Sequence, residues 1–383
     1  MNRRFWTALS AFALVATGAV LAPAVAANAE EPETTAPRAI PKGCSTHGDI
    51  EVCLSDPTTA DGGSDKLIEN RLRELTASAK EGDSIRVAMY TWTRKELAAE
   101  LVAAKDRGVD VKVVLDGVNK QDNTGGYSTL TAGKVPVTNC DPACLGTNIN
   151  HTKYFLSEIG GTKSVVVTSS NMTTTQTTLF NNLLKVDNDA KLYGFYLGFW
   201  ERMNAQSWTH DGTTWGDGDK QIVGDSGAAG YAYPRKGDNM LWMLDSITDC
   251  SADGDGDGDA DNTVWVSASL FTSPRVGIRD RLNALEGMGC DVRVIVENTD
   301  TEAWVEAGGL TKSKVVTVAK SHNKLFIVDA KYLGKWDEVT FSGSHNLTGT
   351  SLETNDEVIL RVSNPEVTKL YQDYHSGLIG SVS

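Results

Sequence analysis

The sequence is short of positive charge. Its 383 residues carry 36 lysines and arginines against 50 aspartates and glutamates, which gives a formal net charge of −14 at pH 7. A chain this acidic repels polyanions at long range, and non-specific nucleic-acid binding depends on neutralising phosphates with lysine and arginine. The composition therefore argues against a nucleic-acid partner. A nuclease stays open as an alternative, because a local basic cleft can exist in an acidic protein.

Long apolar runs are also scarce, and the one that is present lies at the amino terminus. Arg3 and Arg4 precede an apolar segment, residues 5–25, which leads through Ala-Asn-Ala into two glutamates. This order predicts a secretory signal peptide over residues 1–29 and a secreted, extracellular protein. A retained membrane anchor is the alternative, and the missing charged stop-transfer flank argues against it.

The chain also lacks a cysteine–histidine cluster with the spacing of a zinc site. It has six cysteines, an even number that indicates disulfide bonds in an exported protein. Proximity along the chain favours Cys44–Cys53 and Cys140–Cys144, which leaves Cys250–Cys290, although six cysteines allow 15 connectivities.

What the sequence does contain is an internal repeat. Residues 84–116 align without a gap to residues 265–297, and each copy has the pattern of a strand, a helix and a strand. Gly108 and Gly289 stand where the two helices should end, and the closing apolar runs are typical of buried parallel strands. The pattern predicts two tandem α/β domains. We assign residues 30–63 to a loose N-terminal arm, 64–235 to the first domain and 236–383 to the second.

Both copies continue with the same polar residues. The first reads His151-Thr-Lys153, strand, strand, Ser169-Ser-Asn171, and the second reads His322-Asn-Lys324, strand, strand, Ser344-His-Asn346. One His-x-Lys occurs by chance in many proteins, and on a strand it is more often a solvated edge. Two copies at equivalent places, in a chain with only six histidines, indicate a function.

Two His–Lys pairs that face each other suit phosphoryl transfer. Lysine, asparagine and serine donors can hold an anionic phosphoryl group and stabilise its charge in the transition state. One imidazole can attack phosphorus while the other protonates the leaving oxygen. The lysines supply the charge, so no cofactor is expected to be required for catalysis.

The second copy matches the HxKxxxxD…GSxN signature of the phospholipase D superfamily. The chain resembles members of this superfamily from about residue 65 to its end. The first copy departs from the signature at two places. Glu158 replaces the usual Asp, and Thr168 replaces a Gly. In the second copy the usual Asp is present as Asp329. The resemblance implies two α/β/α sandwich domains related by a pseudo-two-fold axis, with one composite site at their interface.

The resemblance also implies a role for each motif residue. His151 is expected to be the nucleophile and His322 the general acid and base. Glu357 resembles the carboxylate that orients a catalytic histidine, and the first copy, which reads Asn181-Asn182 there, is expected to lack such a residue. The remaining residues are expected to bind the phosphate (Lys153, Lys324, Asn171, Asn346), to support those that do (Ser169, Ser344), or to act structurally behind the site (Glu158, Asp329).

Two weaker signals complete the sequence. An acidic run offers carboxylates at alternate positions and resembles a calcium loop, but position 12 is Val264 instead of glutamate, so a flexible acidic loop is the alternative to structural calcium. Its residues are Asp253, Asp255, Asp257, Asp259 and Asp261. His345, inside the second motif, is expected to line the cleft or to face solvent.

Together these features predict a secreted phospholipase D that acts on phospholipids at a membrane or micelle surface and works as a monomer. A secreted nuclease of the same superfamily and a non-catalytic phosphate- or lipid-binding protein are the alternatives.

Overall fold

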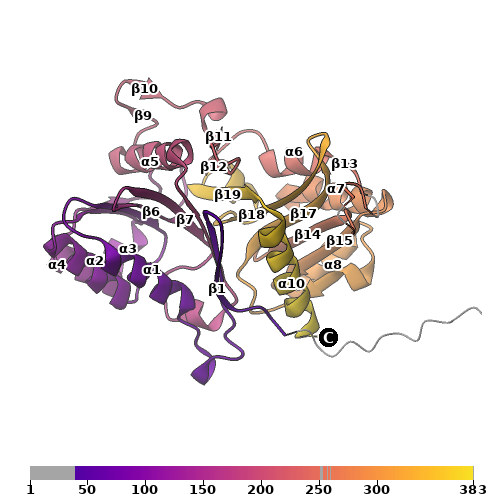
Figure 1. The fold of residues 1–383 in the computed structure, drawn as a ribbon, viewed down its shortest axis with the longest axis horizontal. Helices are drawn as coiled ribbons and strands as arrows, with labels where there is room; N and C mark the ends of the chain where they lie inside the picture. Colours follow the sequence, from indigo (N-terminus) through magenta and orange to yellow (C-terminus); the bar gives the residue numbers. More distant parts are fainter. Residues whose placement is uncertain (1–38, 251–252, 257, 259, 383) are drawn as a thin grey trace, which may run out of the picture. The chain divides into compact units, whose positions relative to one another are not determined.

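Two β-sheets with matching strand order form the framework of the protein (Figure 1). The computed structural model describes residues 39–250, 253–256, 258 and 260–382, and the predicted signal peptide lies outside them. The described residues belong to one compact unit, Pro37–Ser383. The mixed α/β architecture with two sheet-containing halves confirms the fold class predicted from the repeat.

The first sheet has the strand order β1-β2-β8-β7-β6-β3-β4-β5. Strands β3, β4 and β5 are parallel to one another, as the strand–helix–strand pattern predicted, and the other neighbours are antiparallel. The strands are β1 (Gly43–His47), β2 (Ile50–Leu54), β3 (Ser84–Met89), β4 (Asp110–Asp116), β5 (Val137–Cys140), β6 (Lys153–Ile159), β7 (Thr162–Thr168) and β8 (Asn182–Asp187).

The second sheet repeats this order as β11-β12-β19-β18-β17-β14-β15-β16, and β13 adds a further pairing with β17. Its strands are β11 (Gln221–Val223), β12 (Ala229–Tyr233), β13 (Ile247–Asp249), β14 (Thr263–Ala268), β15 (Asp291–Val296), β16 (Val315–Thr317), β17 (Lys324–Tyr332), β18 (Lys335–Gly343) and β19 (Glu357–Ser363). A small separate ribbon joins β9 (Thr209–His210) and β10 (Thr213–Thr214).

Helices cover both sheets. They are α1 (Leu67–Ser78), α2 (Glu96–Asp106), α3 (Val118–Gln121), α4 (Gly125–Ala132), α5 (Ala190–Ala205), α6 (Asn239–Asp245), α7 (Val276–Gly287), α8 (Thr299–Glu306), α9 (Gly349–Glu353) and α10 (Pro365–Gly380). The glycines predicted to end α2 and α7 have φ values of +97° and +100°, which L-residues rarely adopt.

Three hydrophobic clusters hold these layers together. One packs α1 and α2 on the first sheet, and another packs α6 and α7 on the second. The third contains the aromatic face of α5, with Tyr196 and Phe199, and that of α10, with Tyr371 and Tyr374, together with strands of both sheets. The two halves therefore share a core, and the aromatic run at 193–200 belongs to it.

The predicted N-terminal arm is wrong for residues 43–54. They form the β1–β2 pair, and β2 is hydrogen-bonded along its length to β8 of the first sheet. The segment 221–233, which we assigned to the first half, forms the β11–β12 pair and joins β19 of the second sheet in the same way. Each repeat thus begins with a two-stranded unit, ahead of the boundaries at 64 and 236.

The gapless alignment of the repeat is also wrong over its first strand. Ser84 pairs with Glu158, and Thr263, not Trp265, pairs with Asp329. The two copies therefore differ by two residues between this strand and the glycine that ends the following helix. The register makes Met89, opposite Lys153, equivalent to Ala268, opposite Lys324.

All three predicted disulfides are present, namely Cys44–Cys53, Cys140–Cys144 and Cys250–Cys290. The first joins residues that lie opposite each other across β1 and β2. Such bonds are typical of oxidising compartments. Among the helices of the described residues, none has the length and apolar character needed to span a bilayer.

Candidate active site

Each motif histidine is held by the half of the chain to which it does not belong. Short parallel bridges join Asn150 to Asp356 and Phe180 to Ser321. The backbone N–H of His151 donates to the carbonyl of Asp356, and that of His322 donates to the carbonyl of Phe180, each at 2.9 Å. These contacts bring the two His-x-Lys motifs to one interface between the sheets.

The His151 side contains a buried carboxylate. Nδ1 of His151 lies 2.8 Å from Oε1 of Glu357, which has no exposed surface. The Ser344 hydroxyl and the Asn355 amide donate to the same carboxylate, which is therefore braced from two directions. Glu357 is the first residue of β19, so the second half supplies the partner of the first histidine.

The His322 side has an amide at the equivalent place. Nδ1 of His322 lies 3.1 Å from Oδ1 of Asn181, and the Ser169 hydroxyl donates to that oxygen at 2.9 Å. The Asn181 amide nitrogen donates to the Gln176 carbonyl. The first copy was expected to lack an orienting carboxylate, and an amide faces His322 instead. A carboxylate is absent there, and a neutral, braced side chain takes its place.

The two lysines also occupy equivalent positions. Each Nζ donates to the carbonyl of the histidine in its own motif, at 2.7 Å for Lys153 and 2.8 Å for Lys324, and both side chains are buried. Burial lowers the pKa of Lys153 to about 7 and that of Lys324 well below its ordinary range. Two cations close together in a dry site are costly unless an anion joins them.

Burial and the neighbouring lysines lower the pKa of both histidines well below 6.5. Burial raises the pKa of Glu357 to about 8. With the ring proton on Nδ1, His151 donates it to the Glu357 carboxylate over 2.8 Å. Nε2 of His151 then keeps its lone pair and can act as a nucleophile.

The two motif asparagines each carry a buried Oδ1 atom that has no hydrogen-bond partner among the described residues. Asn171 and Asn346 follow Ser169 and Ser344, whose hydroxyls face Asn181 and Glu357. The serines thus brace the partners of the histidines, while the asparagines remain available to a ligand. Unpaired buried amides are rare unless water or a ligand satisfies them.

The motif carboxylates lie away from the histidines. Glu158 lies near the far end of β6 and Asp329 lies in the second half of β17, opposite Ser84 and Thr263. The Glu158 carboxylate is partly exposed and lies 3.6 Å from Lys163, whereas Asp329 is buried. The change from Asp to Glu in the first copy therefore falls outside the histidine–lysine cluster.

Two aromatic contacts were missed by reading the motifs. Tyr90 follows β3, and its ring centre lies 5.1 Å from that of His151 and 5.4 Å from Nζ of Lys153. His345 does not face solvent. It is buried against Tyr233 with 4.2 Å between ring centres, and both of its nitrogens lack a partner among the described residues.

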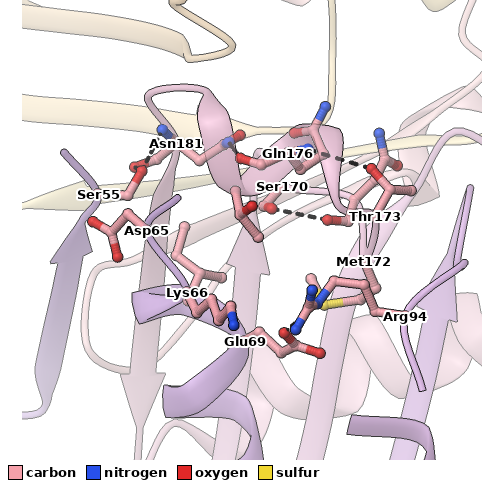
Figure 2. A pocket seen from close by; sticks show the side chains of 13 residues that line it. Ser55, Asp65, Lys66, Glu69, Arg94, Ser170, Met172, Thr173, Gln176 and Asn181 are labelled. Atoms are coloured by element: carbon pink, nitrogen blue, oxygen red, sulfur yellow. Dashed lines mark hydrogen bonds and ion pairs between the residues drawn. The ribbon is translucent and has the colours of Figure 1, made fainter. Parts of the chain in front are cut away.

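A pocket borders the first Ser-x-Asn motif (Figure 2). Asn171 and Asn181 line it from the motif side, and Lys66, Glu69 and Arg94 line it from α1 and the loop after β3. Glu69 and Arg94 form an ion pair across its floor. The pocket therefore lies beside the first motif and reaches Asn171 and Asn181.

The acidic run of the second half is partly described. The carboxylates of Asp253, Asp255 and Asp261 can bring one oxygen each within 4.8 Å of one another, and such hard oxygen donors fit calcium. Asp261 is buried and already accepts the backbone N–H groups of Gly254 and Asp255. Asp257 and Asp259 lie outside the described residues.

Comparison with known structures agrees with this architecture. Phosphatidylserine synthase from Haemophilus influenzae aligns over 90% of this chain and 89% of its own, with a TM-score of 0.60 and 13% identity. Polyphosphate kinase from Porphyromonas gingivalis aligns over 85% of this chain with a TM-score of 0.56 and 12% identity, and the chain spans about half (49%) of that kinase. At these identities the likeness concerns the fold.

No curated protein matches the sequence. The family model described as "Cardiolipin synthase, PLD-like domain" does match it, over residues 72–199 and 258–379. These two segments cover more than half of the chain and contain both His-x-Lys motifs. The chain therefore belongs to this PLD-like family of the phospholipase D superfamily and is an enzyme of the phosphodiesterase type.

Proposed function

We propose that the protein is a secreted phospholipase D that cleaves the headgroup phosphodiester of phospholipids and passes the phosphatidyl group to water or to an alcohol. The observation that carries this proposal is the unequal pairing of two equivalent histidines. His151 faces a buried carboxylate and His322 faces an amide, at 2.8 Å and 3.1 Å. Such inequality suits a reaction in which one imidazole is the nucleophile and the other moves protons.

In the first step, Nε2 of His151 attacks phosphorus and the bond between phosphorus and the headgroup oxygen breaks. Protonated His322 gives its proton to that oxygen, so the headgroup leaves as a neutral alcohol. The product is a phosphatidyl-histidine on His151. Glu357 stabilises the positive charge that develops on this ring, because it accepts the hydrogen bond from Nδ1.

In the second step, neutral His322 takes a proton from water or an alcohol, whose oxygen attacks phosphorus. The bond between phosphorus and Nε2 breaks, and its electron pair returns to His151. Water gives phosphatidate, and an alcohol gives a new phospholipid. His322 ends the cycle protonated, ready for the next headgroup.

The charge of the phosphate is met by residues of the chain. We propose that Lys153, Lys324, Asn171 and Asn346 hold the phosphoryl oxygens, so that catalysis requires no metal. The anion would also offset the two buried ammonium groups, whose pKa values burial lowers in its absence. Any calcium at the acidic loop would then act on stability alone.

Several properties support a phospholipid substrate outside the cell. The family model bears the description of cardiolipin synthase, and the net charge of −14 disfavours a polyanion. Three disulfides and the N-terminal signal-like segment support secretion. The presence of both histidine–lysine pairs argues against a binder without activity. We propose that a single copy is sufficient for activity, since the two halves of one chain complete the site.

The test is headgroup release from phosphatidylcholine, phosphatidylethanolamine and phosphatidylglycerol vesicles, with plasmid DNA as a parallel substrate. We expect released headgroup, intact DNA, and the same rate in EDTA. A fall in melting temperature in EDTA, at unchanged rate, would assign calcium to the acidic loop. Nicked DNA without headgroup release would replace the proposal by a nuclease, and no cleavage of either would leave a binding protein.

The pH dependence of kcat/KM should have its maximum on the acidic side of neutrality. The pKa of Lys153 is lowered to about 7 and that of His322 lies well below 6.5, so both lose their protons as the pH rises. The lowered pKa of His151 keeps its nucleophilic form present below pH 6.5. Initial rates on a short-chain soluble phospholipid between pH 4 and 9 measure the profile. An optimum above pH 8 would contradict it.

A further inference from the structure

The ring of Tyr90 contacts both members of the first histidine–lysine pair. Its centre lies 5.1 Å from the His151 ring centre and 5.4 Å from Nζ of Lys153. The ring is half-buried and directly follows β3, which pairs with the strand that begins at Lys153. A cation within about 6 Å of an aromatic ring centre is attracted by its quadrupole, more strongly where water is excluded.

Among the described residues, no aromatic ring makes such a contact with His322 or Lys324. The register places Ser269 at the position equivalent to Tyr90, because Met89 lies opposite Lys153 and Ala268 opposite Lys324. The Ser269 hydroxyl donates to the Glu297 carboxylate at 3.0 Å. The aromatic contact is thus a property of the half that carries His151, and the duplication of the fold does not explain it.

We propose that Tyr90 is a positioning residue that keeps the Lys153 ammonium group charged and fixed beside His151, through the face of its ring and not through its hydroxyl. This inference rests on the proposed function, since it concerns the lysine that would hold the phosphoryl group. It makes the two lysines unequal. Lys153 is the one whose charged form an aromatic ring stabilises.

The charged groups around Lys153 do not by themselves fix its protonation state. Glu357 from β19 and Asp116 from the end of β4 favour its charged form, while Lys324, His151 and His322 face it from the same cluster. Burial is the largest influence, and it lowers the pKa of Lys153 to about 7. At this value a modest stabilisation of the cation decides how much of the lysine is charged at neutral pH.

The test compares Tyr90→Leu with Tyr90→Phe in the full-length protein. Binding of inorganic sulfate, whose charge does not change between pH 6 and 8, is measured by calorimetry at both values. We expect Tyr90→Leu to bind sulfate within about twofold of wild type at pH 6 and about tenfold more weakly at pH 8. The alkaline limb of kcat/KM should move down by about one pH unit. Tyr90→Phe should match wild type in both measurements.

The matched control is Tyr193→Leu, which removes a ring that lies 6.0 Å from Lys163, a lysine outside the site. A melting curve first shows that this variant folds. It should then bind sulfate as wild type does at both pH values. Equal losses in Tyr90→Phe and Tyr90→Leu, or an unchanged Tyr90→Leu, would overturn the inference. If wild type cleaves no phosphodiester, the proposed function fails, while sulfate binding still decides the role of Tyr90.

Discussion

Replacement of His151 by alanine is expected to lower kcat by about 10³-fold or more and to abolish the covalent intermediate. His151 is buried, its Nδ1 faces Glu357, and its backbone is fixed by Asp356 of the other half. This geometry leaves Nε2 as the nitrogen that can reach phosphorus. The loss should appear in kcat at saturating lipid, because Lys153, Lys324 and the two asparagines still bind the phosphate.

The protein is trapped during turnover of a phospholipid with labelled phosphorus. The label that stays on the protein is then measured after acid treatment and after base treatment. Phosphohistidine is lost in acid and kept in base, which distinguishes it from a phosphate ester. Wild type should carry the base-stable label and His151→Ala should not. His210→Ala removes a histidine that pairs with surface acids, Glu201 and Asp211, and should behave as wild type. Label that survives in His151→Ala and disappears in His322→Ala would exchange the two roles.

The sequence was sufficient to predict the residues that repeat. His151 and His322, their lysines and the Ser-x-Asn pairs stand at or next to the ends of equivalent strands, so local pattern and duplication locate them. The disulfides were predicted because each pair of cysteines is close along the chain or is left over. The strand–helix–strand pattern likewise predicted the parallel pairs β3–β4 and β14–β15.

The interactions that the sequence did not predict are those made between distant segments. Nothing in Asn181 indicates that it faces a histidine 141 residues away, because an asparagine at a strand start is ordinary. The same holds for Tyr90, whose apolar neighbours make it read as part of the buried strand β3. Contacts of this kind depend on how the halves pack, which no local period encodes.

The edges of the sheets show the same limit. Segments 43–54 and 221–233 are short and rich in turn residues, so each alone favours a loop. Each becomes strand because β8 or β19 presents an unpaired edge, and pairing satisfies the backbone groups of both. The comparison of the two sheets shows that each repeat begins with these strands.

The second large effect is expected from Glu357→Gln, which should lower kcat by about 10²- to 10⁴-fold. Its carboxylate accepts the hydrogen bond from Nδ1 of His151, so Nε2 stays unprotonated. A glutamine whose oxygen takes the Oε2 position accepts from Ser344 and places its amide N–H at the Oε1 position, toward Nδ1. Nδ1 must then accept, the ring proton moves to Nε2, and the nucleophile is blocked. Rates of phosphoenzyme formation in a single turnover measure this directly.

The stability of this variant separates chemistry from folding. Glu357 is fully buried and its pKa is raised to about 8, so an uncharged glutamine removes a group that is costly to ionise there. Its melting temperature should therefore equal or exceed that of wild type. Glu353→Gln, at an exposed position of α9, is the matched control and should leave both kcat and the melting temperature unchanged.

Asn181→Asp tests the partner of the other histidine, His322. A carboxylate there should raise the pKa of His322 and shift the alkaline limb of kcat/KM upward, without affecting phosphoenzyme formation as severely. If Glu357→Gln forms the phosphoenzyme at the wild-type rate, the carboxylate does not set the tautomer of His151, and the division of labour between the two histidines must have another origin.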